Sequence, residues 1–178
     1  MKTYKNIEFE INEGVAIITL NRTDVLNSFN FEMADDTIDA LTFSRDEKSI
    51  RAIILTANGK GFCAGQDLEE ATRKNGPNIE EIVEHTYNPI IGLIRNIEKP
   101  VICAVNGVAA GAGANIAIAC DITFAAESAN FIQSFSNIGL VPDSGGTFFL
   151  PRLIGLQRAT AMMFLGNKIT AIEAKEMG

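Results

Sequence analysis

The sequence contains one histidine and three cysteines, and it has no apolar run long enough to cross a lipid bilayer. A membrane-spanning helix needs about 20 apolar residues, and Asn, Asp, Gly or Lys interrupts each apolar stretch well before that length. The N-terminal residues, MKTYKNIEFEI, also lack the apolar segment of a secretory signal. We therefore expect a cytoplasmic protein that does not insert into a membrane.

The scarce cysteine and histidine residues form no metal-binding or redox motif. Cys63, Cys103 and Cys120 lie among apolar or small residues without C-x-x-C spacing, so we expect buried, reduced thiols. His85 lies in a polar stretch with no second histidine or cysteine nearby, which predicts a surface residue. The sequence therefore predicts no metal site, and no G-x-S-x-G segment presents a serine for a Ser/His/Asp triad.

Positive charge is also in short supply. The formal net charge is -7, and no Lys/Arg cluster with interleaved aromatic residues offsets it. This charge balance disfavours binding to DNA, RNA or anionic lipid, because all of these carry a dense negative charge. A small anionic ligand is still compatible with the sequence, since a local site does not require a basic protein.

Two nucleotide-binding motifs are absent as well. No segment has the phosphate-loop pattern G-x-x-x-x-G-K-[ST], because the lysine of NGKGFCAG stands in the wrong place. The dinucleotide pattern G-x-G-x-x-G fails at 111–116, where no third glycine follows Gly111 and Gly113 at the required distance. The glycine-rich segments therefore need another explanation.

Strand and helix patterns alternate along most of the chain. The predicted strands are 7–11, 15–20, 51–57, 101–105, 121–126 and 130–133, the first pair joined by a hairpin turn. The predicted helices are 31–46 with Asn30 as its cap, 80–96 with a kink or break at Pro89, 114–120, and a stretch from 146 onward interrupted by Pro151 and Gly155. Because parallel neighbouring strands need crossover connections, this order predicts one α/β domain, residues 1–178, with a mainly parallel sheet.

Each of two glycine-rich loops follows a predicted buried strand, one around 63–65 and one around 111–113. Backbone N–H groups that converge from such loops can form an oxyanion hole, and fixed donors in a dry site stabilise the negative oxygen of an enolate. The second loop opens a predicted helix, whose positive dipole end would add to this effect. The alternative is that these glycines only permit close packing of strand and helix.

Three longer motifs resemble the crotonase superfamily, also called the enoyl-CoA hydratase/isomerase family. They are GKGFCAGQDL, KPVICAVNGVAAGAGANIAIACDI and SNIGLVPDSGGTFFLPRLIG, in that order. The resemblance implies a spiral of repeated ββα units and an acyl-CoA ligand whose coenzyme A is part of the substrate, with no separate cofactor. It also implies an oxyanion hole from the N–H groups of Ala64 and Gly113. By the same resemblance the CoA-contacting positions are Val25, Gln66, Asp67 and Leu68.

The same resemblance separates hydration from isomerisation. Hydratases of the family use a pair of glutamates to activate water, and the corresponding positions here hold Asn115 and Phe135. Neither an amide nor a phenyl ring can act as a carboxylate base, so simple hydration is disfavoured. Asn115 either bonds the substrate or Asp143, or packs its helix. Phe135 and Phe31 are candidates for the wall of an acyl pocket, with Phe31 also a core candidate.

Asp143 falls where isomerases of the family place a catalytic aspartate. Apolar neighbours at Leu140, Val141 and Phe148 should desolvate its carboxyl and raise its pKa, which would make it a better proton shuttle near neutrality. The alternative is an Asx turn or a cap for the helix that begins near Gly145.

The motifs are most similar to isomerases that act on ring-1,2-epoxyphenylacetyl-CoA in phenylacetate catabolism and that also shift a double bond between 3-enoyl-CoA and 2-enoyl-CoA. Other readings are an enoyl-CoA hydratase, a dienoyl-CoA isomerase or a non-catalytic acyl-CoA-binding subunit. Members of the family usually continue into C-terminal helices beyond the point where this sequence stops. A full-length chain is expected to form a homotrimer or a dimer of trimers.

Overall fold

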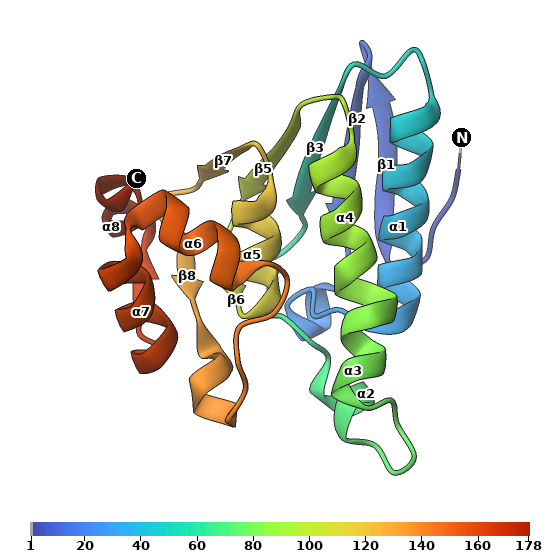
Figure 1. Ribbon diagram of the computed structural model, residues 1–178. Coiled ribbons are helices and arrows are strands. Elements are labelled where there is room, and N and C mark those ends of the chain that lie inside the picture. Colours follow the sequence, from blue (N-terminus) through green and yellow to red (C-terminus); the bar gives the residue numbers. More distant parts are fainter. Residues whose placement is uncertain (1) are drawn as a thin grey trace.

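The computed structural model describes residues 2–178 and contains two β-sheets flanked by helices (Figure 1). The larger sheet consists of β1 (Ile7–Asn12), β2 (Val15–Leu20), β3 (Ala52–Ala57), β5 (Val101–Val105) and β7 (Ile122–Ala125), hydrogen-bonded in that order. The smaller sheet consists of β4 (Gly61–Cys63), β6 (Val108–Ala110), β8 (Asn130–Ile132) and β9 (Lys168–Thr170). All pairings are parallel except the β1/β2 hairpin and the β8/β9 pair.

The sheets are built by a repeated ββα unit. In β3/β4, β5/β6 and β7/β8, the first strand joins the larger sheet and the second joins the smaller sheet, and helices follow each pair. This arrangement confirms the predicted α/β class with parallel sheets and repeated ββα units. It places the end of the second strand of each unit, and the loop after it, at the smaller sheet, where both glycine-rich loops lie.

Eight α-helices lie between and after the strands along the described residues. They are α1 (Phe31–Asp46), α2 (Leu68–Thr72), α3 (Ile79–Ile82), α4 (Asn88–Asn96), α5 (Ala112–Ala119), α6 (Gly146–Ile154), α7 (Leu156–Leu165) and α8 (Ala171–Met177). A π-helical turn covers Val83–Tyr87, and 3-10 turns cover Thr23–Val25 and Ser134–Ile138. Figure 1 shows α1 and α4 side by side against the larger sheet, and α6 to α8 grouped around β8 at the other end of the molecule.

Helix α1 has the predicted bounds. The Asn30 side chain accepts a hydrogen bond from the Met33 N–H, which confirms Asn30 as the N-cap. The inward face of α1 buries Met33, Ala40 and Leu41 completely. Burial of this apolar stripe fixes α1 against the β1/β2 side of the core.

Three short strands were not predicted. β4 and β6 lie inside segments that we expected to be loops, and β9 lies inside the stretch expected to be helical. Each is only 3 residues long, too short for its own sequence to show a strand pattern. Each of them forms because it pairs with a neighbouring strand of the smaller sheet: β4 with β6, β6 also with β8, and β9 with β8.

The proline predictions have mixed outcomes. Pro89 is the second residue of α4, and the backbone is helical without interruption from Ile79 to Asn96. The irregularity predicted in this stretch is the π-helical turn that ends at Tyr87, and the chain does not break at Pro89. Pro151 does not interrupt its helix, because α6 continues through it to Ile154 and ends at Gly155, whose φ is 81°. The prediction at Pro151 is therefore wrong, while the break at Gly155 is confirmed.

Candidate active site around Asp143 and the two glycine-rich loops

Asp143 lies in a tight turn between the 3-10 turn Ser134–Ile138 and α6. Two consecutive residues of this turn, Ser144 at φ 51° and Gly145 at φ 73°, have left-handed backbone conformations. The Ser144 hydroxyl donates to Asp143 Oδ1 at 2.8 Å, and the Gly146 N–H donates to the Asp143 carbonyl oxygen at 2.8 Å. The N-cap of α6 is Gly145 with no side-chain cap, so the alternative reading of Asp143 as a helix cap is wrong.

Burial raises the pKa of the Asp143 carboxyl above its ordinary value of 3.8, and the hydrogen bond from Ser144 offsets only part of this effect. The direction agrees with the desolvation argued from the sequence. Val141 and Phe148, two of the apolar neighbours used in that argument, are 78% and 52% exposed, so the burial comes from elsewhere in the site. A carboxyl with a raised pKa exchanges a proton more readily near neutral pH than an ordinary aspartate does.

The first glycine-rich loop follows β4. Its Ala64 N–H donates to the Leu26 carbonyl oxygen at 3.0 Å, so this group is already paired within the chain. The prediction of Ala64 as an oxyanion donor does not agree with this pairing. Within residues 2–178 the Gln66 N–H has no hydrogen-bond partner, and Gly65 at φ 94° sets the turn that frees it.

The second glycine-rich loop opens α5. Gly111, at φ 53°, precedes the helix, and Asn115 is the first residue whose N–H closes back onto the Gly111 carbonyl. The N–H groups of Ala112 and Gly113 therefore stand at the positive end of α5 without intrahelical partners. These are the free donors that an oxyanion hole requires.

The two loops touch each other. A Cβ at Gly113 would collide with the carbonyl oxygen and side chain of Cys63, and a Cβ at Gly65 would lie 3.1 Å from the Ala110 carbonyl oxygen and 3.7 Å from the Ala112 nitrogen. Close packing of strand and helix is therefore one reason for the glycines. It also brings Gln66 and Ala112 to one place, so the packing role and the donor role are compatible.

Tyr87 belongs to this site, and sequence reasoning assigned it no role. Its hydroxyl donates to Gln66 Oε1 at 2.8 Å, and its ring is buried against Phe29. Burial raises the pKa of Tyr87 well above 10.0, and the negative charges of nearby groups, Asp143 among them, add to this effect. Tyr87 ends the π-helical turn Val83–Tyr87, and such turns are common at functional sites but leave no pattern in a sequence.

The positions predicted to contact CoA come together beside this site. Phe29 bridges the first glycine-rich loop, because its N–H donates to the Gly65 carbonyl at 2.7 Å and its carbonyl accepts from the Asp67 N–H at 2.8 Å. The segment that carries Val25 therefore runs alongside the segment that carries Leu68. Val25 and Leu68 are 42% and 62% exposed, which leaves both apolar side chains accessible to a ligand.

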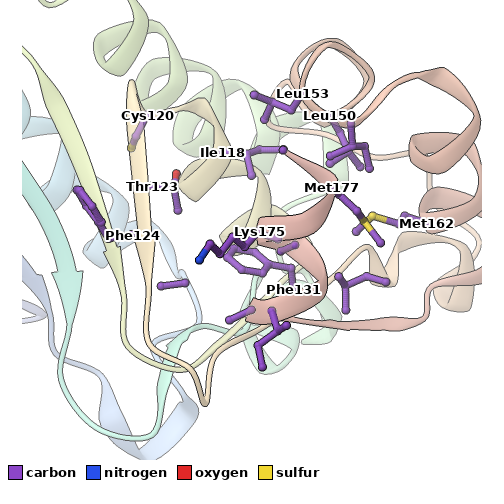
Figure 2. Close-up of a pocket in the computed structure, with 18 of the residues that line it drawn as sticks. Ile118, Cys120, Thr123, Phe124, Phe131, Leu150, Leu153, Met162, Lys175 and Met177 are labelled. Carbon is purple, nitrogen blue, oxygen red and sulfur yellow. The ribbon is translucent and has the colours of Figure 1, made fainter.

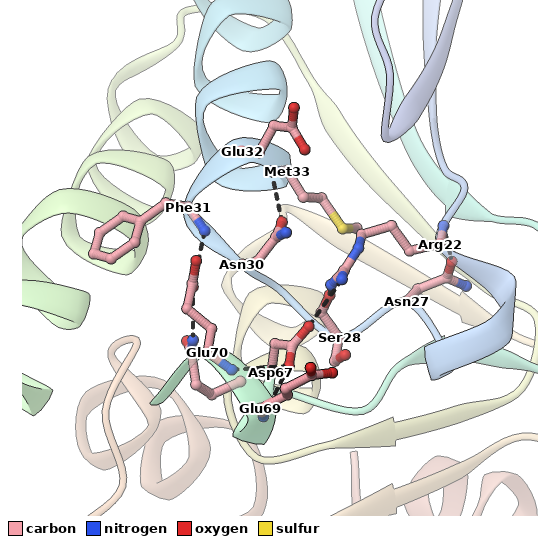
Figure 3. A network of polar contacts seen from close by, with 12 residues as sticks. Arg22, Asn27, Ser28, Asn30, Phe31, Glu32, Met33, Asp67, Glu69 and Glu70 are labelled. Carbon is pink, nitrogen blue, oxygen red and sulfur yellow. Dashed lines mark hydrogen bonds and ion pairs between the residues drawn. The ribbon is translucent and has the colours of Figure 1, made fainter. Parts of the chain in front are cut away.

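The Asp67 carboxylate bonds groups of the protein itself (Figure 3). Its Oδ2 pairs with Arg22 Nη2 at 2.8 Å, in an ion pair whose side chains are only 12% and 19% exposed. Its Oδ1 accepts from the N–H groups of Glu69 and Glu70 at the start of α2. Burial opposes ionisation of Asp67, but the hydrogen bonds from Arg22 and the α2 backbone outweigh it and lower the pKa. The geometry makes Asp67 a brace that holds the loop in place.

The remaining predicted positions are distributed as follows. Asn115 is completely buried on α5 and donates from Nδ2 to the main-chain carbonyl of Asp143 at 2.9 Å. Phe135 is buried, with its ring 3.7 Å from the position of a Cβ on Gly111. Phe31 packs against the main core and faces His85 edge-on at 6.3 Å, so it lies with the core.

A separate cavity of about 800 Å³ lies between β7, β8 and the helices α6 to α8 (Figure 2). Its walls are mostly apolar, with Ile118, Phe131, Leu150 and Met177 among them. None of the predicted catalytic or CoA-contacting residues lines it. Gln133, which bonds Asn115, also lines it, so the cavity borders the site around Asp143 without containing any of those predicted residues.

The other sequence expectations concern cysteines, metals and membranes. All three cysteines are buried and unpaired, as expected, and His85 is exposed. Among the residues that the structure describes, no group of three or more His, Cys, Asp or Glu side chains is placed to hold a metal ion. In the same part of the chain, every helix is too short or too polar to cross a bilayer.

Comparison with known proteins gives one family. The profile described as Enoyl-CoA hydratase/isomerase matches residues 10–178. A Rhodobacter capsulatus protein named "Probable enoyl-CoA hydratase" is 47% identical over 99% of this chain and 67% of its own length. The 1,2-epoxyphenylacetyl-CoA isomerase of Escherichia coli is 46% identical over 94% of this chain and 65% of its own length. This chain therefore spans about two thirds of the length of these relatives.

Solved structures agree with the sequence relatives. An enoyl-CoA hydratase from Bacillus anthracis superposes with a TM-score of 0.89 at 37% identity, covering 98% of this chain and 68% of that chain. An enoyl-CoA hydratase/isomerase from Pseudoalteromonas atlantica superposes with a TM-score of 0.88 at 33% identity, covering 98% and 67%. The similarity extends over the whole of the described fold.

Replacing Asp67 tests its bracing role. Asp67→Ala removes both the Arg22 ion pair and the α2 cap, and we expect the free energy of unfolding to fall by about 1–3 kcal/mol. Asp67→Asn keeps an acceptor for the cap and should lose less. Because the folded-state pKa is lowered, the charge-dependent part of the stabilisation exists above the ordinary value of 3.8 and disappears as the pH falls through the folded-state value. Urea unfolding at neutral and acidic pH measures both effects, and an Asp67→Ala variant as stable as the parent would contradict them.

Replacing Asp143 tests its burial. Its folded-state pKa is raised above 3.8, so ionisation costs stability as the pH rises through the folded-state value. Asp143→Asn keeps an oxygen for Ser144 but has no charge to bury, so we expect a higher melting temperature than the parent at neutral pH and an equal one below 3.8. The exposed carboxyl of Asp35 on α1 provides the control, because Asp35→Asn should show no such difference. A lower melting temperature for Asp143→Asn at neutral pH would be inconsistent with a raised pKa.

Proposed function

Because the chain belongs to the enoyl-CoA hydratase/isomerase family, we propose that it acts as an acyl-CoA isomerase with Asp143 as the proton shuttle. The observation that carries this proposal is the partly buried Asp143 carboxyl with its raised pKa. Asn115 of α5 bonds the Asp143 main chain, and the Asp143 charge acts on Tyr87, whose hydroxyl bonds Gln66 of the first loop. An aspartate in this environment can accept a proton from one carbon and return it to another. No separate cofactor is needed for such a transfer.

The donor groups follow from the hydrogen bonds already made. We assign the oxyanion hole to the N–H of Gln66 and to the first turn of α5 at Ala112 and Gly113, in place of Ala64. The Tyr87 hydroxyl donates to the Gln66 side chain and thereby stabilises the loop that presents the Gln66 N–H. The positive end of α5 favours a negative thioester oxygen at this position.

The reaction that suits this arrangement moves a double bond. Asp143 removes a proton from C2 of a 3-enoyl-CoA, the electron pair passes into the thioester carbonyl, and the oxyanion donors hold the resulting dienolate. The C3–C4 electron pair then takes the same proton back from Asp143 at C4, which leaves the 2-enoyl-CoA and an ionised Asp143. No atom is gained or lost, so no water enters the step.

Asn115 and Phe135 argue against hydration as the main activity. An amide cannot take a proton from water, and the buried ring of Phe135 cannot bind water. The E. coli relative extends the range of candidate substrates to 1,2-epoxyphenylacetyl-CoA, and an aromatic acyl group would suit the apolar Phe135 side chain. The exposed Val25 and Leu68 side chains are the proposed contacts for the CoA part.

A spectroscopic assay tests the assignment. With 3-enoyl-CoA as substrate, formation of the conjugated 2-enoyl-CoA is expected for the parent chain, and Asp143→Asn should lower kcat by about 10²- to 10⁴-fold, the usual contribution of a general acid/base. Asp35→Asn serves as the control and should keep full activity. The proposal would be falsified if Asp143→Asn isomerised at the parent rate. Loss of crotonyl-CoA absorbance would instead indicate a hydratase, as the name of the R. capsulatus relative suggests.

A further inference from the structure

A chain of two buried amides supports the Asp143 turn from behind. Asn115 Nδ2 donates to the Asp143 carbonyl oxygen at 2.9 Å, and Gln133 Nε2 donates to Asn115 Oδ1 at 2.7 Å. Asn115 is 0% exposed and Gln133 is 1% exposed. The amides therefore connect the end of β8, through α5, to the main chain of the proposed proton shuttle.

The turn needs this support because its backbone is strained. Ser144 is a non-glycine residue at φ 51°, and such a left-handed conformation persists only where the surroundings hold it in place. Asn115 provides that hold in two ways. It bonds the Asp143 carbonyl, and its amide packs so closely against Gly146 that a Cβ there would collide with it.

Gln133 holds the Asn115 amide in the orientation that the turn requires. The Asp143 carbonyl can only accept, so it takes the nitrogen of Asn115, and the oxygen at the other end of the amide accepts from Gln133 Nε2. Within residues 2–178, Gln133 Oε1 is buried without a partner. The bond to Asn115 is therefore the one side-chain hydrogen bond that Gln133 makes in this part of the chain.

We propose that Asn115, held by Gln133, is a positioning residue that fixes the Asp143 turn and so aims the Asp143 carboxyl at the substrate. This inference rests on the proposed role of Asp143. Neither amide touches the reacting atoms, and both act through the main chain of Asp143. Asn115 thus stands where the family's hydratases place one of their two glutamates, and in this chain it sets the geometry of a single acid.

Asn115→Asp is the most direct test, because it keeps the size and the acceptor oxygen but replaces the donor nitrogen with an oxygen that repels the Asp143 carbonyl. With 3-enoyl-CoA we expect kcat to fall by about 10- to 100-fold, as displacement of a reacting group does, while KM changes less than about twofold. Asn6→Asp is the matched control. Asn6 is also a buried amide, bonded to Asp36 far from the site, so its replacement should lower the melting temperature and leave kcat unchanged.

Gln133→Met covers the case in which a buried carboxylate prevents folding. It introduces no charge, removes the unpaired oxygen and removes the donor that holds the Asn115 side-chain oxygen. We expect an unchanged circular dichroism spectrum and a kcat reduced by about 3- to 10-fold. The loss should be smaller than for Asn115→Asp because the hydrogen bond from Asn115 to the Asp143 carbonyl survives. An unchanged kcat in a folded Gln133→Met protein would contradict the role of Gln133.

A double-variant cycle separates this inference from the proposed function. If Asn115 acts through Asp143, then adding Asn115→Asp to Asp143→Asn should cause no further loss of kcat, whereas a purely structural role would give additive losses. An inactive Asp143→Asn combined with a fully active Asn115→Asp would overturn the positioning role alone. An active Asp143→Asn would overturn the proposed function itself.

Discussion

The close contact between β4 and the start of α5 is the constraint on which the site depends. Gly113 lies directly against the Cys63 carbonyl, and only a residue without a side chain fits there. This contact brings the loop after β4 to the positive end of α5, so Gly65, next to Gln66, lies against the Ala112 nitrogen. Without the contact between Gly113 and Cys63, the loops after β4 and β6 would not come together to form one site.

Most polar side chains of the site form structural hydrogen bonds, whereas among the described residues the Asp143 carboxyl forms only one side-chain hydrogen bond. The side chains of Asp67, Asn115 and Gln133 form their hydrogen bonds within the chain, and they hold the loop after β4 and the Asp143 turn in place. The Asp143 carboxyl has one side-chain donor, Ser144, and no partner from the helix that follows. A fully bonded carboxylate would have a low pKa and little reason to exchange a proton, so the sparse bonding of Asp143 is consistent with the role proposed for it.

Several features of this arrangement could be predicted from the sequence. The fold class, helix α1 with its Asn30 cap, and the strands of the larger sheet follow from periodicity that is visible within a single segment. The resemblance of the motifs located both loops and Asp143. It assigned Ala64 as a donor, and this assignment fails because the Leu26 carbonyl, almost 40 residues away in sequence, takes the Ala64 N–H. Hydrogen bonds between distant segments are not visible in a local pattern.

The sequence by itself determined which residues could do chemistry: an acid at 143 and no carboxylate at 115 or 135. Tertiary structure alone decided which backbone groups remain free, that Tyr87 reaches Gln66 from a π-helical turn, and that two buried amides meet behind the Asp143 turn. The physical reason is that residue type sets the proton affinity and bonding capacity of a group, whereas burial and the partners that use that capacity depend on segments brought together only by folding.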